Sequence, residues 1–203
     1  MRRIALLAAA LLCTACVTTV ELRSTIAPSD VPADKSSDAA AVVCAADLLA
    51  HVERAQGYEF ALGEPLCSAL QRSVESTYRS GERVAAPYKG QFARVVRFYL
   101  TSSSLGLRSL PDGSLRASYS VGVAVETCGR DLKPTIRKLV TGTGIVARSD
   151  ATGSELVKEA AEAALQQVAD NASHLLVAGL DGPRVRGSRS APAEPALPAA
   201  PER

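Results

Sequence analysis

The chain has 203 residues, of which 47% are hydrophobic, 4% are aromatic and none is tryptophan, which predicts one domain with a core of valine, leucine and alanine. It has 23 basic and 21 acidic residues, and because two of the basic ones are Arg2 and Arg3, the chain without residues 1–15 is formally neutral. A neutral chain gives no electrostatic reason to expect nucleic acid as a partner.

The first sixteen residues have the layout of a secretory signal peptide. A basic start at Arg2 and Arg3 is followed by the unbroken apolar run Ile4–Leu12 and then by small residues. A transmembrane helix is the alternative, but crossing a bilayer needs about 20 apolar residues, and Thr14 already ends the run. We therefore predict that residues 1–15 are a signal peptide and that the protein is exported.

The segment Leu12-Cys13-Thr14-Ala15-Cys16 resembles a lipobox, the processing motif of bacterial lipoproteins. The resemblance implies cleavage before Cys16 and its acylation with chains such as palmitate, and two or more chains give a stable anchor. The family usually has leucine where this chain has Cys13. Because Cys13-Thr14-Ala15 also fits ordinary signal peptidase, a soluble periplasmic protein is the alternative. In that family a residue other than Asp after the cysteine implies the outer membrane, and Val17 stands there.

The remaining chain divides by composition into three parts. We interpret residues 16–38 as the lipidated N-terminus and a tether, although Thr18–Ile26 alternates enough for a short strand. Residues 39–182 contain the periodic apolar patterns and form the predicted α+β domain. Residues 183–203 are rich in Arg, Ala, Pro and Glu and cannot bury apolar surface, so we predict a disordered tail.

The predicted domain opens with two short elements and a helix. Ala41–Leu49 is an apolar run that fits a buried strand or a helix, and its β-branched residues favour the strand. Tyr58–Leu62 is a second extended segment. A helix then begins around Pro65, a residue suited to the first helical position, and is expected to end at Ser80-Gly81. Its apolar stripe consists of Leu66, Ala69, Leu70, Val74 and Tyr78.

Three long strands are predicted next, over Phe92–Leu107, Leu115–Thr127 and Thr135–Ala147. The first connection contains Pro111 and Gly113, which are typical of a tight turn, and residues 128–134 form the second. Short connections between successive strands predict an antiparallel meander. In the middle strand Tyr119, Val121, Val123 and Val125 share one face, and Ser118, Ser120, Gly122 and Ala124 share the other.

The last predicted element is a helix that begins with a capping box, in which Thr152 is the N-cap and Glu155 reaches back to it. Its inner stripe is Val157, Ala161, Ala164, Leu165 and Val168, and it is expected to run to about His174. Two helices can cover one face of the meander. The predicted fold is therefore an α+β two-layer sandwich.

The sequence contains no motif that we interpret as a catalytic, metal-binding or cofactor-binding site. Gly142–Ala147 has the spacing of a dinucleotide-binding loop, but that loop must open a helix, and here it lies within a predicted strand. We interpret these glycines as a bulge or a place of close packing. His51 and His174 are the only histidines, and we interpret both as surface residues. We predict no catalytic, metal or cofactor site.

Three cysteines remain besides Cys13 and Cys16, namely Cys44, Cys67 and Cys128. In an oxidising compartment two of three exported cysteines are expected to pair. Cys44 and Cys67 are the first choice, because a strand end beside the start of the following helix brings them together. The alternatives are Cys67 with Cys128, or no bond. A Cys44–Cys67 pair would leave Cys128 in a turn as the remaining thiol.

The order of signal, tether, helix after a Gly-x-Pro start, three long strands and C-terminal helix resembles small outer-membrane lipoproteins, in particular the ABC-transport auxiliary and YajG-like ones. The resemblance covers about residues 39–180 and depends on element order and on Tyr58–Tyr78. It implies a non-enzymatic binding or scaffold role at the periplasmic face of the outer membrane, with an envelope protein complex as partner. The alternative is a periplasmic enzyme with an unrecognised active site, which should bring His51, His174 or several carboxylates together in a polar pocket.

Overall fold

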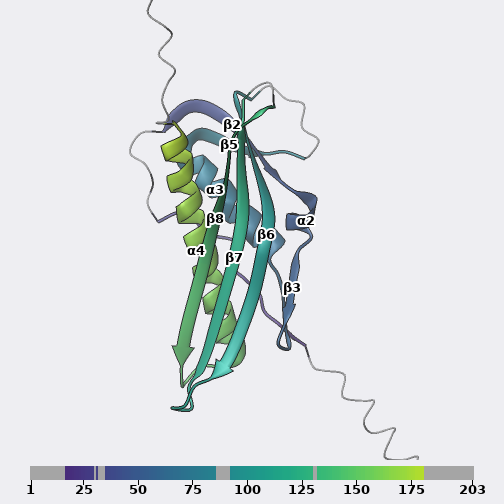
Figure 1. Cartoon of the computed structure of the whole chain (residues 1–203), viewed down its shortest axis with the longest axis vertical. Helices are drawn as coiled ribbons and strands as arrows, with labels where there is room; N and C mark the ends of the chain where they lie inside the picture. The colour runs from purple at the N-terminus through teal and green to yellow at the C-terminus, as the bar shows by residue number, and fades with distance from the viewer. Residues whose placement is uncertain (1–16, 30, 32–34, 86–91, 130–131, 181–203) are drawn as a thin grey trace, which may run out of the picture.

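The centre of the fold is an antiparallel meander of three long strands, β6 (Arg94–Ser109), β7 (Leu115–Cys128) and β8 (Pro134–Arg148) (Figure 1). It belongs to a computed structural model that describes residues 17–29, 31, 35–85, 92–129 and 132–180. The three strands lie where the alternating sequence pattern predicts them. The predicted signal peptide, Cys16 and the predicted tail over 183–203 lie outside the described residues.

The sheet is larger than the predicted meander. Strand β2 (Ser36–Cys44) pairs parallel with β6, and β5 (Tyr78–Arg83) pairs parallel with β2, so the order is β5-β2-β6-β7-β8. The fold is α+β, as predicted, but its main sheet is mixed. Strand β2 begins at Ser36, so the folded domain starts before residue 39, the first residue predicted for it from the sequence.

Strand β5 replaces the end predicted for the first long helix. Helix α3 (Gly63–Thr77) stops at Thr77, and Ser80-Gly81, expected to end it, lies inside β5. Near the end of α3 the hydroxyl groups of Ser76 and Thr77 both donate to the Ser73 carbonyl. Such local side-chain bonds to the backbone are typical of helix ends.

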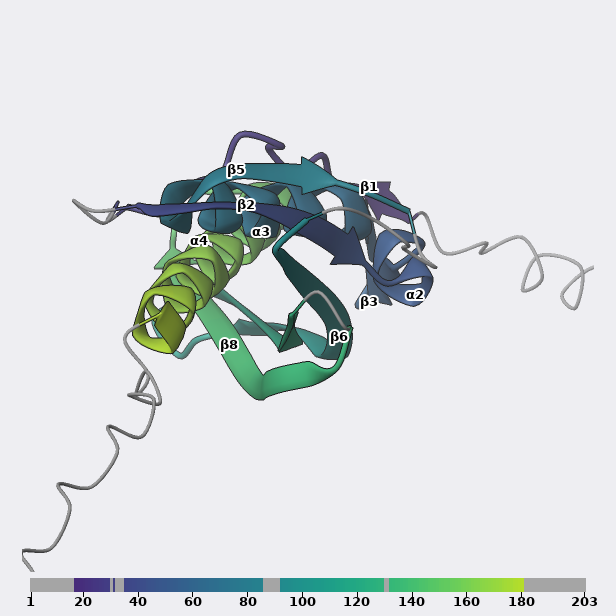
Figure 2. The same cartoon turned by 90° about the horizontal axis from the view of Figure 1, so that it is seen from above.

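Two helices cover the concave face of the sheet, which curves around them (Figure 2). One is α3 and the other is α4 (Gly153–Leu180), which continues beyond the predicted end at His174. The capping box of α4 is confirmed. The Thr152 N–H donates to Glu155 Oε2 at 2.8 Å, and the Glu155 N–H donates to Thr152 Oγ1 at 3.3 Å. A short helix, α2 (Ala46–Leu49), occupies the second half of the run predicted as one strand.

A second, three-stranded sheet contains β1 (Thr18–Thr19), β4 (Tyr58–Ala61) and β3 (Val52–Ala55), in the order β1-β4-β3. Strands β3 and β4 form a hairpin whose turn residues, Gln56 and Gly57, have φ of 54° and 82°. Positive φ at both central residues gives a turn whose backbone twist matches that of the two flanking strands. The small sheet packs on the main core through Phe60, whose ring lies 5.4 Å from that of Tyr119 in an edge-to-face arrangement.

The two faces of β7 differ in burial up to Ser120, as the alternation predicts, whereas from Val121 to Cys128 the residues of both faces are buried. Its inner residues are almost fully buried in the main core; they are Tyr119, Val121, Val123 and Val125. On the outer face Ser118 and Ser120 are partly exposed, whereas Gly122 lies under the Ser102 and Thr101 side chains of β6. A second small cluster of Ala41, Val43, Val95 and Cys128 covers one end of this outer face.

Candidate functional site

The segment that follows the predicted anchor is bound to the domain. The Thr18 N–H donates to the Gly57 carbonyl, and the Val20 N–H to the Glu59 carbonyl, both at 2.8 Å. Val20 and Ile26 are buried in the main core, with exposed fractions of 6% and 8%. Residues 20–29, called the N-terminal strap below, therefore do not form the predicted tether.

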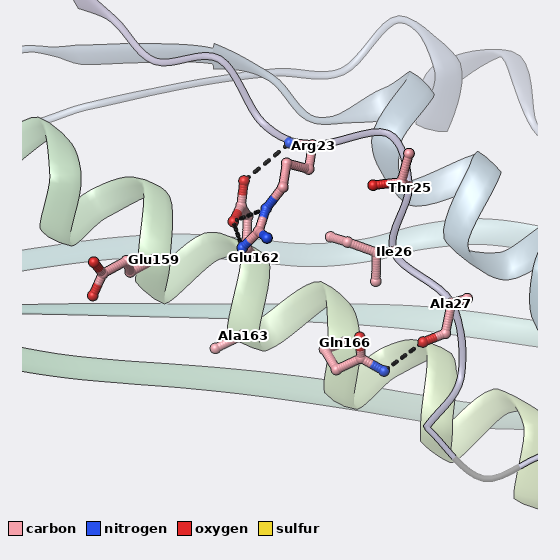
Figure 3. Close-up of a pocket in the computed structure, with 8 residues that line it drawn as sticks. All are labelled: Arg23, Thr25, Ile26, Ala27, Glu159, Glu162, Ala163 and Gln166. Carbon is pink, nitrogen blue, oxygen red and sulfur yellow. Dashed lines mark hydrogen bonds and ion pairs between the residues drawn. The ribbon is translucent and has the colours of Figure 1, made fainter.

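A pocket of about 490 Å³ lies between this strap and helix α4 (Figure 3). The strap and the helix each contribute four of its lining residues. They are Arg23, Thr25, Ile26 and Ala27 from the strap, and Glu159, Glu162, Ala163 and Gln166 from α4. In the close-up the Arg23 side chain extends toward Glu162, and Gln166 reaches the Ala27 carbonyl.

The polar groups of this pocket mostly bind one another. Arg23 donates from its backbone N–H to Glu162 Oε1 at 3.0 Å and from Nε to Oε2 at 2.6 Å. The hydrogen bond and the negative charge of Glu162 raise the pKa of the Arg23 guanidinium. Gln166 Nε2 donates to the Ala27 carbonyl at 2.6 Å. The buried carboxylate of Glu162 is neutralised by its ion pair with Arg23, and the arrangement fastens the strap to α4.

Sequence reasoning missed Arg23 and Glu162. The two residues are 139 positions apart, and neither belongs to a local motif. A charged residue on the inner side of a helix is the one signal that Glu162 offers, because acidic side chains are rarely buried without a partner.

His51 lies in a small polar cluster at the edge of the core. Its Nε2 is 3.0 Å from Ser103 Oγ and 3.7 Å from Glu53 Oε2. Tyr119 Oη donates to Glu53 Oε2 at 3.4 Å, and burial together with the Glu53 charge raises the pKa of the Tyr119 hydroxyl. The side chain of His51 is 29% exposed, so it is only partly a surface residue.

This cluster brings together a serine, a histidine and a carboxylate, but not in the order of a catalytic relay. Such a relay needs the carboxylate on the ring nitrogen opposite to the one that faces the serine. Here Ser103 and Glu53 both lie nearest Nε2 of His51. His174 is exposed on α4. Within the described ranges, no three His, Cys, Asp or Glu side chains form a group that could hold a metal ion.

A disulfide joins Cys44, at the end of β2, to Cys67 in the first turns of α3, with Cα atoms 6.1 Å apart. This is the pair chosen from the sequence, and the geometry is the strand end beside a helix start that the choice assumed. Cys128 is buried as the last residue of β7. The expectation that it lies in a turn was wrong, because β7 continues in register with β6 up to that residue.

The glycines of the rejected dinucleotide motif mark close packing. A Cβ at Gly142 would overlap the Ala164 carbonyl oxygen, and one at Gly144 would overlap that of Ala160. Helix α4 also covers the free edge of β8: the Thr143 N–H donates to Gln167 Oε1 at 2.6 Å, and Asn171 Nδ2 donates to the Thr141 carbonyl at 2.7 Å.

None of the helices in the described part of the chain has the length and apolarity that a bilayer-crossing helix needs. In sequence, a single residue, Val17, stands between Cys16 and the first residue of β1. Two residues of extended chain span at most about 7 Å. Any group attached to Cys16 is therefore held close to the surface of the domain.

No family model matches the chain, and no curated protein matches it in sequence. Among solved structures, the chain is similar to protein XCC0632 from Xanthomonas campestris, of family model DUF330, with a TM-score of 0.54 and 16% identity over 81% of this chain and 97% of that one. A minor lipoprotein from Acinetobacter baumannii aligns with a TM-score of 0.44 and 10% identity over 72% and 96% of the two chains. Uncharacterized lipoprotein B from Nitrosomonas europaea aligns with a TM-score of 0.41 and 16% identity over 72% and 89%. The Xanthomonas similarity shows a shared fold.

Proposed function

We propose that this protein is a non-enzymatic lipoprotein, anchored through acylated Cys16 at the periplasmic face of the outer membrane. In this proposal it is a binding or scaffold component of an envelope assembly or lipid-transport system, and its partner is an envelope protein complex. The observation that carries the proposal is the position of the lipobox-like cysteine, two residues before the first strand of the domain.

A binding role fits the polar groups of the domain better than catalysis does. Of the two carboxylates that line the pocket beside α4, Glu162 is bound to Arg23 and Glu159 to Arg148. The His51 cluster lacks the geometry of a relay. Both arrangements hold segments together: the first fastens the strap, and the second links β3 to β6. The wide outer face of β6, β7 and β8 remains as the surface for a partner.

Mass spectrometry of the mature N-terminal peptide tests the anchor. We expect an acylated N-terminal Cys16 in the wild type and no acylation in the Cys16→Ser variant, which should leave the membrane fraction. Cys13→Ser is the matched control, because it changes the neighbouring cysteine of the same motif and should leave acylation intact. An unmodified N-terminal Cys16, recovered in the soluble fraction, would contradict the proposal.

Two further experiments test the location and the role. Val17→Asp should move the protein from the outer to the inner membrane fraction on a density gradient, and an unchanged distribution argues against the outer-membrane assignment. Affinity purification of the wild type from detergent-solubilised envelopes should recover envelope proteins in fixed ratio. Recovery of the chain alone under these conditions contradicts the scaffold role.

A further inference from the structure

One end of the molecule lies next to the predicted anchor. The Thr18 N–H is bonded to Gly57 in the β3–β4 turn, and the neighbouring Gln56 accepts from the Leu107 N–H of β6 through its side-chain oxygen at 2.8 Å. The β6–β7 turn lies at this same end, while the C-terminal end of α4 lies at the opposite one (Figure 1). A lipid on Cys16 therefore places the β3–β4 and β6–β7 turns toward the bilayer.

Two arginines face each other at this end. Arg108 of β6 and Arg116 of β7 are directly opposite in the register, next to the last pair before the turn. Directly opposed residues in a sheet have Cβ atoms roughly 5 Å apart, and like charges at these positions are destabilising. Among the described residues, neither arginine has an ion pair or hydrogen bond to an acidic side chain.

The other arginines nearby are neutralised. Arg54 in the β3–β4 hairpin binds Glu59 at 2.8 Å, and Arg148 at the end of β8 binds Asp150 and Glu159. The acidic group of the β6–β7 turn, Asp112, accepts from the Ser114 N–H and Oγ, and these bonds lower the pKa of its carboxyl. Its carboxylate is thus used within the turn, and the Arg108–Arg116 pair keeps its positive charge.

We propose that Arg108 and Arg116 bind the phosphate groups of anionic lipids in the membrane that holds Cys16. This inference rests on the proposed function for the orientation of the domain, and it adds a second, electrostatic contact to the lipid anchor. Arginine is suited to phosphate because its planar fork donates two parallel hydrogen bonds. A basic residue near an anionic bilayer strengthens binding about five-fold, so the pair is expected to contribute about thirty-fold.

Vesicle cosedimentation tests the contact without the lipid anchor. The probe is the mature chain from residue 16 carrying Cys16→Ser, mixed at low salt with vesicles of phosphatidylethanolamine and phosphatidylglycerol, or of phosphatidylcholine alone. We expect binding to the anionic vesicles only, and about thirty-fold weaker binding for the double variant Arg108→Gln/Arg116→Gln. Removing two opposed like charges should not unfold the sheet, and circular dichroism checks this.

The matched control is Arg79→Gln/Arg137→Gln, which removes the same charge from two exposed residues elsewhere. Arg79 lies in β5, and Arg137 is opposite Glu126, ten residues along β7 from Arg116, or about 33 Å. Its binding should stay close to that of the unchanged probe. Equal loss in both double variants, no loss in either, or equal binding to neutral vesicles would overturn the proposal. Because the probe cannot be acylated, these results are independent of the mass-spectrometric test of Cys16.

Discussion

On one side helix α4 lies so close to β8 that its backbone carbonyls approach the glycines of the strand, whereas on the other side it holds the N-terminal strap through polar side chains. On the β8 side Gly142 and Gly144 leave no room for a Cβ beside the helix carbonyls. On the strap side the polar contacts to α4 come from Arg23 and Ser29, which are open to water, beside the buried apolar side chains of Val20 and Ile26. The close packing at the glycines tolerates no larger side chain, whereas the exposed polar contacts of the strap can be replaced by contacts with water. Variants on the β8 side should therefore lower the free energy of unfolding, whereas variants on the strap side should mainly change local amide exchange.

The largest effect is expected from Gly144→Val. The new side chain would overlap the backbone of Ala160, which cannot move aside as a flexible side chain would. Overpacking of this kind costs about 3 kcal/mol of the free energy of unfolding, which urea denaturation measures. Thr143→Val is the control, because Thr143 is exposed on the other face of the same strand and should cost less than about 0.5 kcal/mol. An unchanged urea midpoint for Gly144→Val would mean that α4 does not approach β8 this closely.

The β8 side was largely predictable from sequence, and the strap side was not. Alternation in residues 115–127, the capping box at Thr152 and the small residues of α4 are local signals, and each predicts a regular element. Gly142 and Gly144 predicted a place of close packing, but the sequence did not indicate that α4 is the element packed against them. The strap is fastened to α4 by Arg23 and Ser29, and their partners Glu162 and Asp170 lie 139 and 141 residues away in the sequence. No local pattern encodes such contacts.

The sequence predictions that were wrong also concern segments whose structure depends on contacts with distant parts of the chain. Strand β5 has the sequence Tyr-Arg-Ser-Gly-Glu-Arg, which lacks apolar alternation and becomes a strand only because β2 supplies parallel partners. The meeting of His51 with Ser103 depends on how β3 packs against β6, which tertiary structure alone decides. The disulfide was accessible from sequence because Cys44 and Cys67 flank a short return within the chain.

Val123→Ala is expected to have the second-largest effect and measures ordinary apolar packing on the helix-facing side of the sheet. Val123 is fully buried, and loss of two methyl carbons should cost about 1–2.5 kcal/mol by transfer and cavity terms. Ser120→Ala on the outer face removes one partly exposed hydrogen bond to Ser104 and should cost about 0.5 kcal/mol. Equal costs in urea denaturation would show that the two faces of β7 are assigned the wrong way round.

Gln167→Ala tests the polar part of the β8 side. The variant removes the acceptor for the Thr143 N–H, which then bonds to water, so the expected cost is about 0.5–1 kcal/mol. Amide exchange at Thr143 should become faster, and the uncovered edge should favour association with other strands. Asn171→Ala is the companion variant, since it frees the Thr141 carbonyl and leaves the Thr143 bond intact. Unchanged exchange at Thr143 in Gln167→Ala would contradict the covering role of α4.

The smallest effect on global stability is expected from Arg23→Ala, and it is the sharpest test of the strap. The Arg23 side chain is 68% exposed, whereas that of Glu162 is 6% exposed. Because the pair is open to water on the Arg23 side, truncating Arg23 lets water reach the carboxylate, and the loss of the pair should cost little free energy of unfolding. The urea midpoint should therefore hardly change. Locally, however, Glu162 loses the Arg23 guanidinium and keeps only the bond from the backbone N–H of residue 23, so the strap is held less firmly and amide exchange from Val20 to Ile26 should become faster. Gln167→Ala is the control, because it removes a hydrogen bond between α4 and β8 on the opposite side of the helix and should leave exchange in the strap unchanged. If Arg23→Ala lowers the urea midpoint as much as Val123→Ala does, the polar contact of Arg23 with α4 contributes as much stability as buried apolar packing, and the contrast between the two sides of α4 fails.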